Sequence, residues 1–196
     1  ERANEANERL GFAQNLLQNL QKYRSFDTYQ DGIVTANELA ADLAINDSKL
    51  DQETLDYIIV AHNTGDISCS SGQVDTLPSV ASKVKAKLKI KNPNCVAYDI
   101  ICGCPGWVEG IIQAKSFIKS GMAEKCLVVG CDTLSRILDE NDRDSMIYAD
   151  GSGAIILESD NSYNGGILSH KSATFTYDGE NDFIFYGASY DIKKRT

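Results

Sequence analysis

Short, predominantly apolar runs alternate with segments of helical spacing along the middle of the chain. The runs cover residues 57–61, 95–101 and 126–131, and a fourth candidate covers residues 154–157. Apolar runs of this length are typical of strands that are covered on both faces. Their alternation with helices predicts an α/β fold, in which a mixed, mostly parallel sheet with right-handed crossovers carries helices on both faces.

The segments between these runs predict helices. Residues 80–88 place apolar residues on one side and three lysines on the other, so we expect a helix with a solvated lysine face. Pro78 is expected in its first turn, where a missing N–H is tolerated. Residues 107–118 are apolar over much of the circumference, which predicts a central helix ended by Gly121.

The two ends of the chain are less regular. Residues 4–22 have helical spacing and lead into a polar loop. Thr35 and Glu38 predict a capping box at the start of a short helix that ends near Asn46. Beyond Glu158 the pattern loosens, and we expect an outer strand near Gly165–Leu168 and then a hairpin or loop.

Composition narrows the function classes. A net charge of -9 among 196 residues argues against a broad basic face that binds nucleic acid. No window approaches the roughly 18 apolar residues of a membrane span, and there is no signal-peptide pattern, so we expect no membrane association and a cytoplasmic location. The six cysteines mostly lie in apolar runs, which favours reduced thiols. Because the chain starts at Glu1 and ends without a closing element, we expect a fragment.

One cysteine lies where a strand turns directly into a helix. Cys104 stands between Gly103 and Pro105-Gly106, just after the run 95–101. Unpaired N–H groups and a partial positive charge at the start of a helix favour the thiolate form, which attacks carbonyl groups. A backbone N–H near the sulfur would supply half of an oxyanion hole. A buried structural cysteine in a tight turn is an equally good interpretation of this tetrapeptide.

Other candidate groups carry weaker signals. Cys102 and Cys104 offer too few ligands for a metal site, so no metal is expected and Cys102 is interpreted as a packing residue. His62 follows a strand on the same sheet edge as Cys104, and it is either a base for the thiol or a residue that caps the loop. His170 is expected on the surface.

A glycine-rich turn at residues 150–153 precedes the fourth apolar run. It lacks the spacing and the lysine of a phosphate-binding loop, so a tight turn at the start of a strand is the favoured interpretation. Arg143 could contact a phosphate, or it could form a surface ion pair with the aspartates on either side.

An ordered set of motifs resembles one known family. The set comprises Leu55-Asp-Tyr-Ile-Ile-Val60, Thr76-Leu-Pro-Ser-Val-Ala81, Tyr98-Asp99 ahead of Cys104-Pro-Gly-Trp107, Ser120-Gly121, Leu127-Val-Val-Gly130, Ser135-Arg136, Asp142-Arg143 and Asp150-Gly-Ser-Gly153. In order and spacing it is similar to the N-terminal half of β-ketoacyl-[acyl carrier protein] synthase III, from about residue 35 to residue 166. The set is far more specific than any single motif in it.

The resemblance implies a thiolase-like fold of two similar halves, each with a five-stranded mixed sheet, assembled as a homodimer. Residues 1–34 would form an N-terminal helix and loop, residues 35–166 the N-terminal half, and residues 167–196 the start of the segment that leads to the C-terminal half. Leu77 falls where the family places an apolar residue that reaches the partner subunit's acyl pocket.

The resemblance also implies an acyltransferase of fatty acid biosynthesis with no permanently bound cofactor. Cys104 would accept an acyl group from acyl-coenzyme A as a thioester. A carbanion from decarboxylated malonyl-acyl carrier protein would then attack that thioester in a Claisen condensation. Arg143 matches a residue that contacts coenzyme A in the family.

Some family features have no counterpart here. The family's catalytic histidine and asparagine belong to the second half, and the N-terminal Trp-containing coenzyme A segment finds no match in residues 1–34. Pro105 and Trp107 differ from the residues more usual after the cysteine. We therefore expect the chain alone to be inactive in condensation. The alternatives are a same-fold acyltransferase without decarboxylation, a non-catalytic partner subunit of a condensing enzyme, and, at a distance, a metal-binding redox module.

Overall fold

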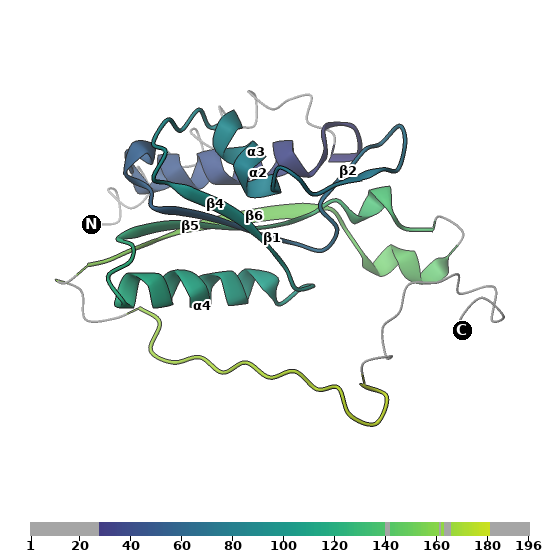
Figure 1. Ribbon diagram of the computed structural model, residues 1–196. Coiled ribbons are helices and arrows are strands. Elements are labelled where there is room, and N and C mark those ends of the chain that lie inside the picture. The colour runs from purple at the N-terminus through teal and green to yellow at the C-terminus, as the bar shows by residue number, and fades with distance from the viewer. Residues whose placement is uncertain (1–27, 140–141, 161, 163–165, 181–196) are drawn as a thin grey trace, which may run out of the picture.

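The computed structural model describes residues 28–139, 142–160, 162 and 166–180 (Figure 1). The helix expected over residues 4–22 therefore lies outside the described residues, as does half of the loop expected over residues 23–32. The loop prediction is wrong for residues 28–32, which belong to a helix. No helix in the described part of the chain is both long and apolar enough to cross a membrane.

A four-stranded sheet forms the centre of the described structure. Its strands are β1 (Tyr57–His62), β4 (Val96–Ile101), β5 (Lys125–Asp132) and β6 (Gly151–Glu158), in the order β4-β1-β5-β6. β1 pairs in parallel with both β4 and β5, whereas β6 runs antiparallel to β5. The prediction of a mixed, mostly parallel sheet is confirmed, and the described residues supply four of the five strands that the resemblance implies.

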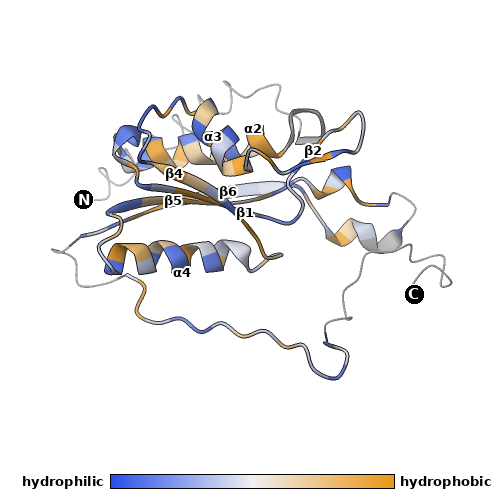
Figure 2. Cartoon of the chain, viewed as in Figure 1, coloured by the Kyte–Doolittle hydropathy of each residue, from blue (hydrophilic) through white to orange (hydrophobic). Residues whose placement is uncertain are grey.

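Helices cover both faces of this sheet, as the alternating pattern predicted. α2 (Thr28–Ser48) and α3 (Val80–Lys87) lie on one face, and α4 (Gly106–Lys119) lies on the other (Figure 1). Apolar residues follow the strands between these layers (Figure 2). Two parallel strands that follow each other in the chain need such a crossover. The chain must return to the end of the sheet where the first strand began before the second strand can start.

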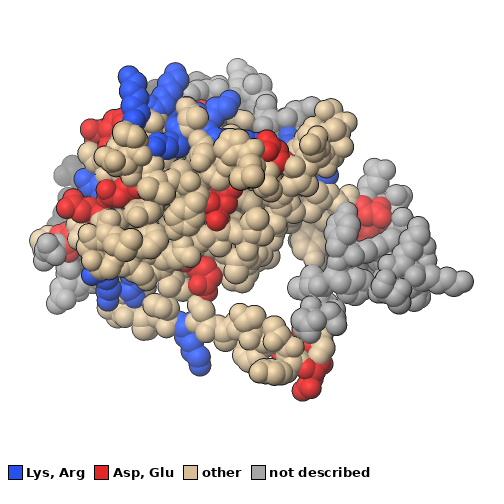
Figure 3. All heavy atoms as spheres, in the orientation of Figure 1, with Lys and Arg blue, Asp and Glu red and all other residues tan. Residues whose placement is uncertain are grey.

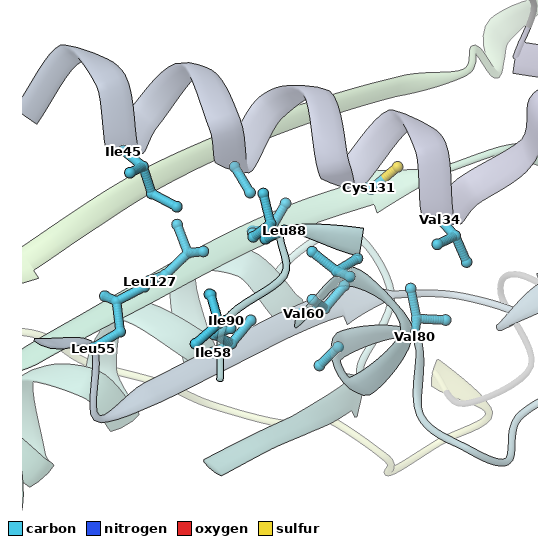
Figure 4. Packing of buried hydrophobic residues seen from close by; sticks show 14 of the residues in the cluster. Val34, Ile45, Leu55, Ile58, Val60, Val80, Leu88, Ile90, Leu127 and Cys131 are labelled. Atoms are coloured by element: carbon cyan, nitrogen blue, oxygen red, sulfur yellow. The ribbon is translucent and has the colours of Figure 1, made fainter. Parts of the chain in front are cut away.

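Alternation along the strands divides the core into two clusters. Ile58 and Val60 of β1 face α2 and α3, where Leu127 and Leu88 complete the packing (Figure 4). Ile59 faces α4 on the other side of the sheet. Because successive side chains of a strand point to opposite faces, an unbroken apolar run is what a strand with two covered faces needs.

The buried cysteines follow the same alternation. Cys131 packs in the cluster under α2 and α3, whereas Cys126 packs under α4. Burial raises the pKa of each of these thiols to about 12. All six cysteines are free thiols in the structure, which fits the expectation of reduced thiols.

Helix starts differ from the predicted ones. α2 is interrupted at Gly32, whose φ is 78°. Thr35 lies inside the helix beyond this interruption, so the predicted capping box is wrong. α3 starts after the N-cap Ser79, whose side chain accepts a hydrogen bond from the N–H of Ser82. Pro78 therefore precedes the cap rather than occupying the first turn.

The segment expected to be a loop at residues 63–76 contains a small antiparallel hairpin. Its strands are β2 (Asp66–Ile67) and β3 (Val74–Asp75). Lys83 of α3 holds both strands, because its Nζ lies 3.1 Å from Asp66 Oδ2 and 2.6 Å from Asp75 Oδ2. The predicted solvated role is wrong for this lysine. Basic side chains gather over the α2 and α3 layer in Figure 3, with acidic ones among them.

Three 3-10 helices complete the regular structure of the described residues, namely η1 (Gln52–Thr54), η2 (Leu134–Arg136) and η3 (Arg143–Ile147). Residues 166–180 then run below α4 without a strand (Figure 1). The outer strand expected near residues 165–168 is therefore absent from its described part, residues 166–168.

Candidate active site

The turn that carries Cys104 joins the end of β4 to the start of α4. Gly103 has a φ of 59°, and its carbonyl accepts a hydrogen bond of 3.0 Å from the N–H of Gly106. This left-handed conformation is open to glycine but unfavourable for residues with a Cβ. Pro105 is the N-cap, one residue before the first helical position that was expected for it. Cys104 thus lies at the helix mouth with an exposed side chain.

Cys104 opens into a hollow of about 420 Å³ at one edge of the sheet. The lining comes from the Cys104 turn, from the carboxyl ends of β1 and β5, and from the start of β6; it comprises Ala61, Gly103, Cys104, Trp107, Gly130, Cys131, Asp132, Ala149, Gly151 and Gly153. In open α/β sheets this edge is the usual place for a ligand. Because Cys104 is exposed, its interpretation as a buried structural cysteine is wrong, and its role as a nucleophile stays a prediction.

Trp107 forms one wall of this hollow. It packs so closely on β5 that a Cβ added to Gly130 would lie 3.0 Å from its Cβ and from its Cδ1. The absence of a side chain at Gly130 lets the indole reach the sheet. The indole ring and the neighbouring glycines make much of this wall apolar, as is common in small-molecule sites.

Asp132, the last residue of β5, also lines the hollow. Its Oδ1 accepts a hydrogen bond of 2.8 Å from the N–H of Asn63, and its Oδ2 accepts one of 2.6 Å from Asn63 Nδ2. Burial raises the pKa of the Asp132 carboxyl, and the hydrogen bonds from Asn63 oppose that shift. Neither residue was predicted as a site residue, although Asp132 directly follows the apolar run 126–131 and Asn63 comes two residues after the run 57–61.

His62 does not line the hollow. It is 2 % exposed, and its Nδ1 accepts a hydrogen bond of 2.9 Å from the N–H of Gly65. Its Nε2 lies 3.1 Å from Asp99 Oδ2, in a direction that does not make a hydrogen bond. Asp99 in turn accepts hydrogen bonds from the N–H groups of Val80 and Ala81 at the start of α3. His62 is therefore the loop-capping residue, and its use as a base for Cys104 is not supported.

The remaining candidates lie around this edge. Cys102 is exposed, so its interpretation as a packing residue is wrong. His170 is exposed, as expected. Among the described residues, no group of three His, Cys, Asp or Glu side chains is placed to hold a metal ion.

The tight turn predicted at residues 150–153 is wrong for residues 151–153, which form the first part of β6 and pair with β5. Asp150 accepts hydrogen bonds of 2.9 Å and 2.6 Å from the N–H and Oγ of Ser135. Arg143 is the first residue of η3, but its side chain lies outside the described part of the structure.

Comparisons with known proteins agree with this fold. Residues 98–175 match the family model described as 3-Oxoacyl-[acyl-carrier-protein (ACP)] synthase III. The β-ketoacyl-[acyl-carrier-protein] synthase III of Ehrlichia ruminantium (strain Gardel) is 39% identical over 131 residues, which are 66% of this chain and 38% of the relative. The enzyme of the same name from Neisseria gonorrhoeae (strain NCCP11945) is 39% identical over 133 residues, or 64% of this chain and 39% of the relative.

Solved structures show the same likeness. 3-oxoacyl-[acyl-carrier-protein] synthase III from Aquifex aeolicus VF5 superposes with a TM-score of 0.57 at 33% identity, over 66% of this chain and 39% of that one. The synthase III from Pseudomonas aeruginosa PAO1 gives a TM-score of 0.56 at 31% identity, over 67% and 38% of the two chains. The chain thus spans about two fifths of the length of the relatives it matches. It has the thiolase-like fold and belongs to the β-ketoacyl-[acyl-carrier-protein] synthase III family.

Proposed function

We propose that the protein is a condensing enzyme in which Cys104 accepts an acyl group from acyl-coenzyme A. The observation that carries this proposal is the exposed Cys104 thiol at the mouth of α4, on the rim of a hollow at the carboxyl ends of the parallel strands. A purely structural cysteine would be buried, as Cys126 and Cys131 are in β5. A reactive thiol needs exposure together with a site that stabilises its charge.

The first half-reaction is transfer of the acyl group to sulfur. The Cys104 thiolate attacks the thioester carbonyl of acyl-coenzyme A, the new carbon–sulfur bond forms, and coenzyme A leaves as its thiolate. The N–H of Cys104 is free to face the developing oxyanion, because none of the hydrogen bonds found among the described residues uses it. Such a donor stabilises charge that appears only in the transition state.

The hollow is large enough for the reacting part of such a thioester. Its volume of about 420 Å³ falls within the range of about 300–1,000 Å³ that is common for small-molecule sites. Its indole and glycine walls suit a short acyl chain, and Arg143 is our candidate for contact with coenzyme A. Coenzyme A thioester is then a substrate and not a resident cofactor.

The second half-reaction forms the carbon–carbon bond. Malonyl-acyl carrier protein loses carbon dioxide, and the resulting carbanion attacks the carbonyl of the Cys104 thioester. The β-ketoacyl product stays on the carrier protein, and the Cys104 thiolate leaves. The histidine and asparagine that the family uses here have no match in this chain, so we expect condensation only in a protein that also contains them.

A second copy of the chain is the proposed partner at the hairpin side. Leu77, which follows β3, has 84% of its surface exposed, and its place in the family motif predicts contact with the acyl pocket of a second subunit. A Leu77→Asp variant should weaken the homodimer, and light scattering coupled to size-exclusion chromatography would measure this. An unchanged dimer in that variant would contradict the proposed role of Leu77.

Self-acylation tests the nucleophile. The protein at its full natural length is incubated with acetyl-coenzyme A, and intact mass is measured for wild type, Cys104→Ala and Cys102→Ala. The last variant is a matched control because it removes the other exposed thiol of the same turn. Wild type and Cys102→Ala should gain one acetyl group, whereas Cys104→Ala should gain none. Acetylation of Cys104→Ala to the wild-type level would refute the assignment, and no acetylation of wild type would favour a non-catalytic partner subunit.

A further inference from the structure

A carboxylate joins the ends of two central strands beside Cys104. Asp132 ends β5, and Asn63 directly follows β1. Both carboxylate oxygens of Asp132 are engaged, one by the N–H of Asn63 at 2.8 Å and the other by Asn63 Nδ2 at 2.6 Å. We call this pair the Asn63–Asp132 clip.

The clip fixes the orientation of the Asn63 amide. Because Nδ2 donates to Asp132, the amide oxygen must point away from the carboxylate. That oxygen lies against the turn of the nucleophile, since a Cβ added to Gly103 would be 3.7 Å from Asn63 Oδ1. Gly103 is the left-handed residue directly before Cys104. The carboxylate of Asp132 therefore determines which end of the amide faces the turn.

Asp132 is well placed to act on the site without touching the substrate's reacting bond. It lines the same hollow as Cys104, and its side chain is committed to Asn63. The link spans 69 residues of sequence, so it joins two strand ends that no local structure holds together. A charge-assisted, two-point hydrogen bond is both stronger and more directional than a neutral single one.

We propose that Asp132 is a positioning residue, which acts through Asn63 to hold the Gly103–Cys104 turn in the geometry needed for acyl transfer. The proposal rests on the proposed function, because it assumes that Cys104 is acylated. It assigns to Asp132 a role in the rate of acyl transfer that goes beyond stability of the fold.

A matched control lies at the opposite ends of the same two strands. There Asp56 precedes β1, and its Oδ2 accepts hydrogen bonds of 2.7 Å and 2.9 Å from the N–H groups of Glu124 and Lys125 at the start of β5. Asp56 thus joins the same two strands with a carboxylate, but far from the hollow. Asp56→Asn should weaken the fold much as Asp132→Asn does while leaving the chemistry of Cys104 unchanged.

The exchange of the two side chains provides a rescue. In the double variant Asn63→Asp, Asp132→Asn, the amide at position 132 accepts from the N–H of residue 63 and donates to its carboxylate. Both hydrogen bonds return, with donor and acceptor exchanged only in the bond between the two side chains, and an oxygen again faces Gly103. Asp132→Asn alone either sets two NH₂ groups against each other or makes the Asn63 amide flip, in which case both hydrogen bonds form but an NH₂ group instead of an oxygen faces Gly103.

The experiment measures the rate and the concentration dependence of Cys104 acetylation by acetyl-coenzyme A, using rapid quench and mass spectrometry. Asp132→Asn should lower the maximal acylation rate by about tenfold with little change in the half-saturating concentration. The double variant should recover most of that loss, and Asp56→Asn should stay within about twofold of wild type. Asn63→Ala, whose change lies in a partly exposed loop, should show the same loss if Asp132→Asn does not fold.

Two results overturn the inference in distinguishable ways. If wild type is acetylated but Asp132→Asn and Asn63→Ala react no more slowly than Asp56→Asn, the positioning role is wrong and the proposed function stands. A failure of the double variant to recover the rate, at a stability equal to that of wild type, has the same meaning. If wild type itself is not acetylated at Cys104, the proposed function is wrong and the inference falls with it.

Discussion

Replacement of Gly103 by alanine tests whether the left-handed turn holds the nucleophile in place. A Cβ at this position meets nothing closer than 3.7 Å, so steric overlap is not the obstacle. The obstacle is the φ of 59°, because a left-handed conformation costs a residue with a Cβ about 1–2 kcal/mol. Alanine also restricts the unfolded chain, which returns about 0.4–1 kcal/mol. The net loss of unfolding free energy should be about 1 kcal/mol.

Gly121 provides the matched control. It has a φ of 75° just after the C-cap Ser120, and no atom lies within 4 Å of its added Cβ. Gly121→Ala should therefore lose about the same free energy as Gly103→Ala, and both melting temperatures should fall by about 2–4 °C. The two variants differ in that only Gly103 is adjacent to Cys104.

The assay compares stability and chemistry in the same variants. Urea unfolding gives the free energy, and the rate of acetylation by acetyl-coenzyme A reports on Cys104. Relief of strain by a shift of the turn would misplace the sulfur, and a misplacement of about 1 Å lowers a rate by as much as about a hundredfold. We expect Gly103→Ala to be acetylated at least about tenfold more slowly than Gly121→Ala. Equal rates at equal stability would refute the claim that this turn positions the nucleophile.

Three further predictions concern the surroundings of the site. The added methyl group of Gly130→Ala should press on Trp107, the chain's single tryptophan, and destabilise the fold by about 1–3 kcal/mol. The tryptophan fluorescence emission should shift, and an unshifted emission spectrum would argue against this contact. Because burial raises the pKa of Cys126 to about 12, its thiol should stay protonated and unlabelled by iodoacetamide in the native protein near neutral pH. Labelling as fast as that of the exposed turn cysteines would contradict its burial. Lys83→Met should speed amide hydrogen exchange in the β2–β3 hairpin. Since Lys83 lowers the pKa of Asp75 below 3.8, this ion pair should stabilise the hairpin above that pH and lose its effect as the pH falls below it. Amide hydrogen exchange that is equally fast in wild type and Lys83→Met near neutral pH would contradict the role of Lys83 in holding the hairpin.

The central strands could be predicted because both of their faces are buried. The interior residues of β1 and β5 are predominantly apolar, and the predicted runs agree with their observed bounds to within a residue. β6 was predicted only from Ala154, whereas it starts at Gly151. Glycines give no alternation of apolar and polar side chains, so the first part of this strand carried no signal.

The hairpin and the Asn63–Asp132 clip could not be predicted for a different reason. Each strand of the hairpin has two residues, too few for a period to show, and Lys83 anchors it through ion pairs that depend on tertiary structure. Asn63 and Asp132 are 69 residues apart, and nothing in the local sequence of either one points to the other. Long-range polar contacts of this kind follow from the register of the parallel strands.

Cys104 shows what local sequence contributes to a site. The tetrapeptide around it predicted a thiol at a helix mouth, and the structure confirms that placement. Local sequence left open whether the thiol was buried, because burial depends on what the neighbouring strands bring to that edge. The hollow is lined by residues of β1, β5 and β6, which are separated from Cys104 in sequence.

The most direct test of the central claim is to locate the acyl group within the turn. After incubation with acetyl-coenzyme A, the protein is digested at low pH, and the peptide that contains Cys102 and Cys104 is fragmented between the two cysteines by mass spectrometry. We predict a single acetyl group on Cys104 that neutral hydroxylamine removes, as expected of a thioester. An acetyl group on Cys102, or an unmodified peptide from active protein, would contradict the assignment of Cys104 as the nucleophile.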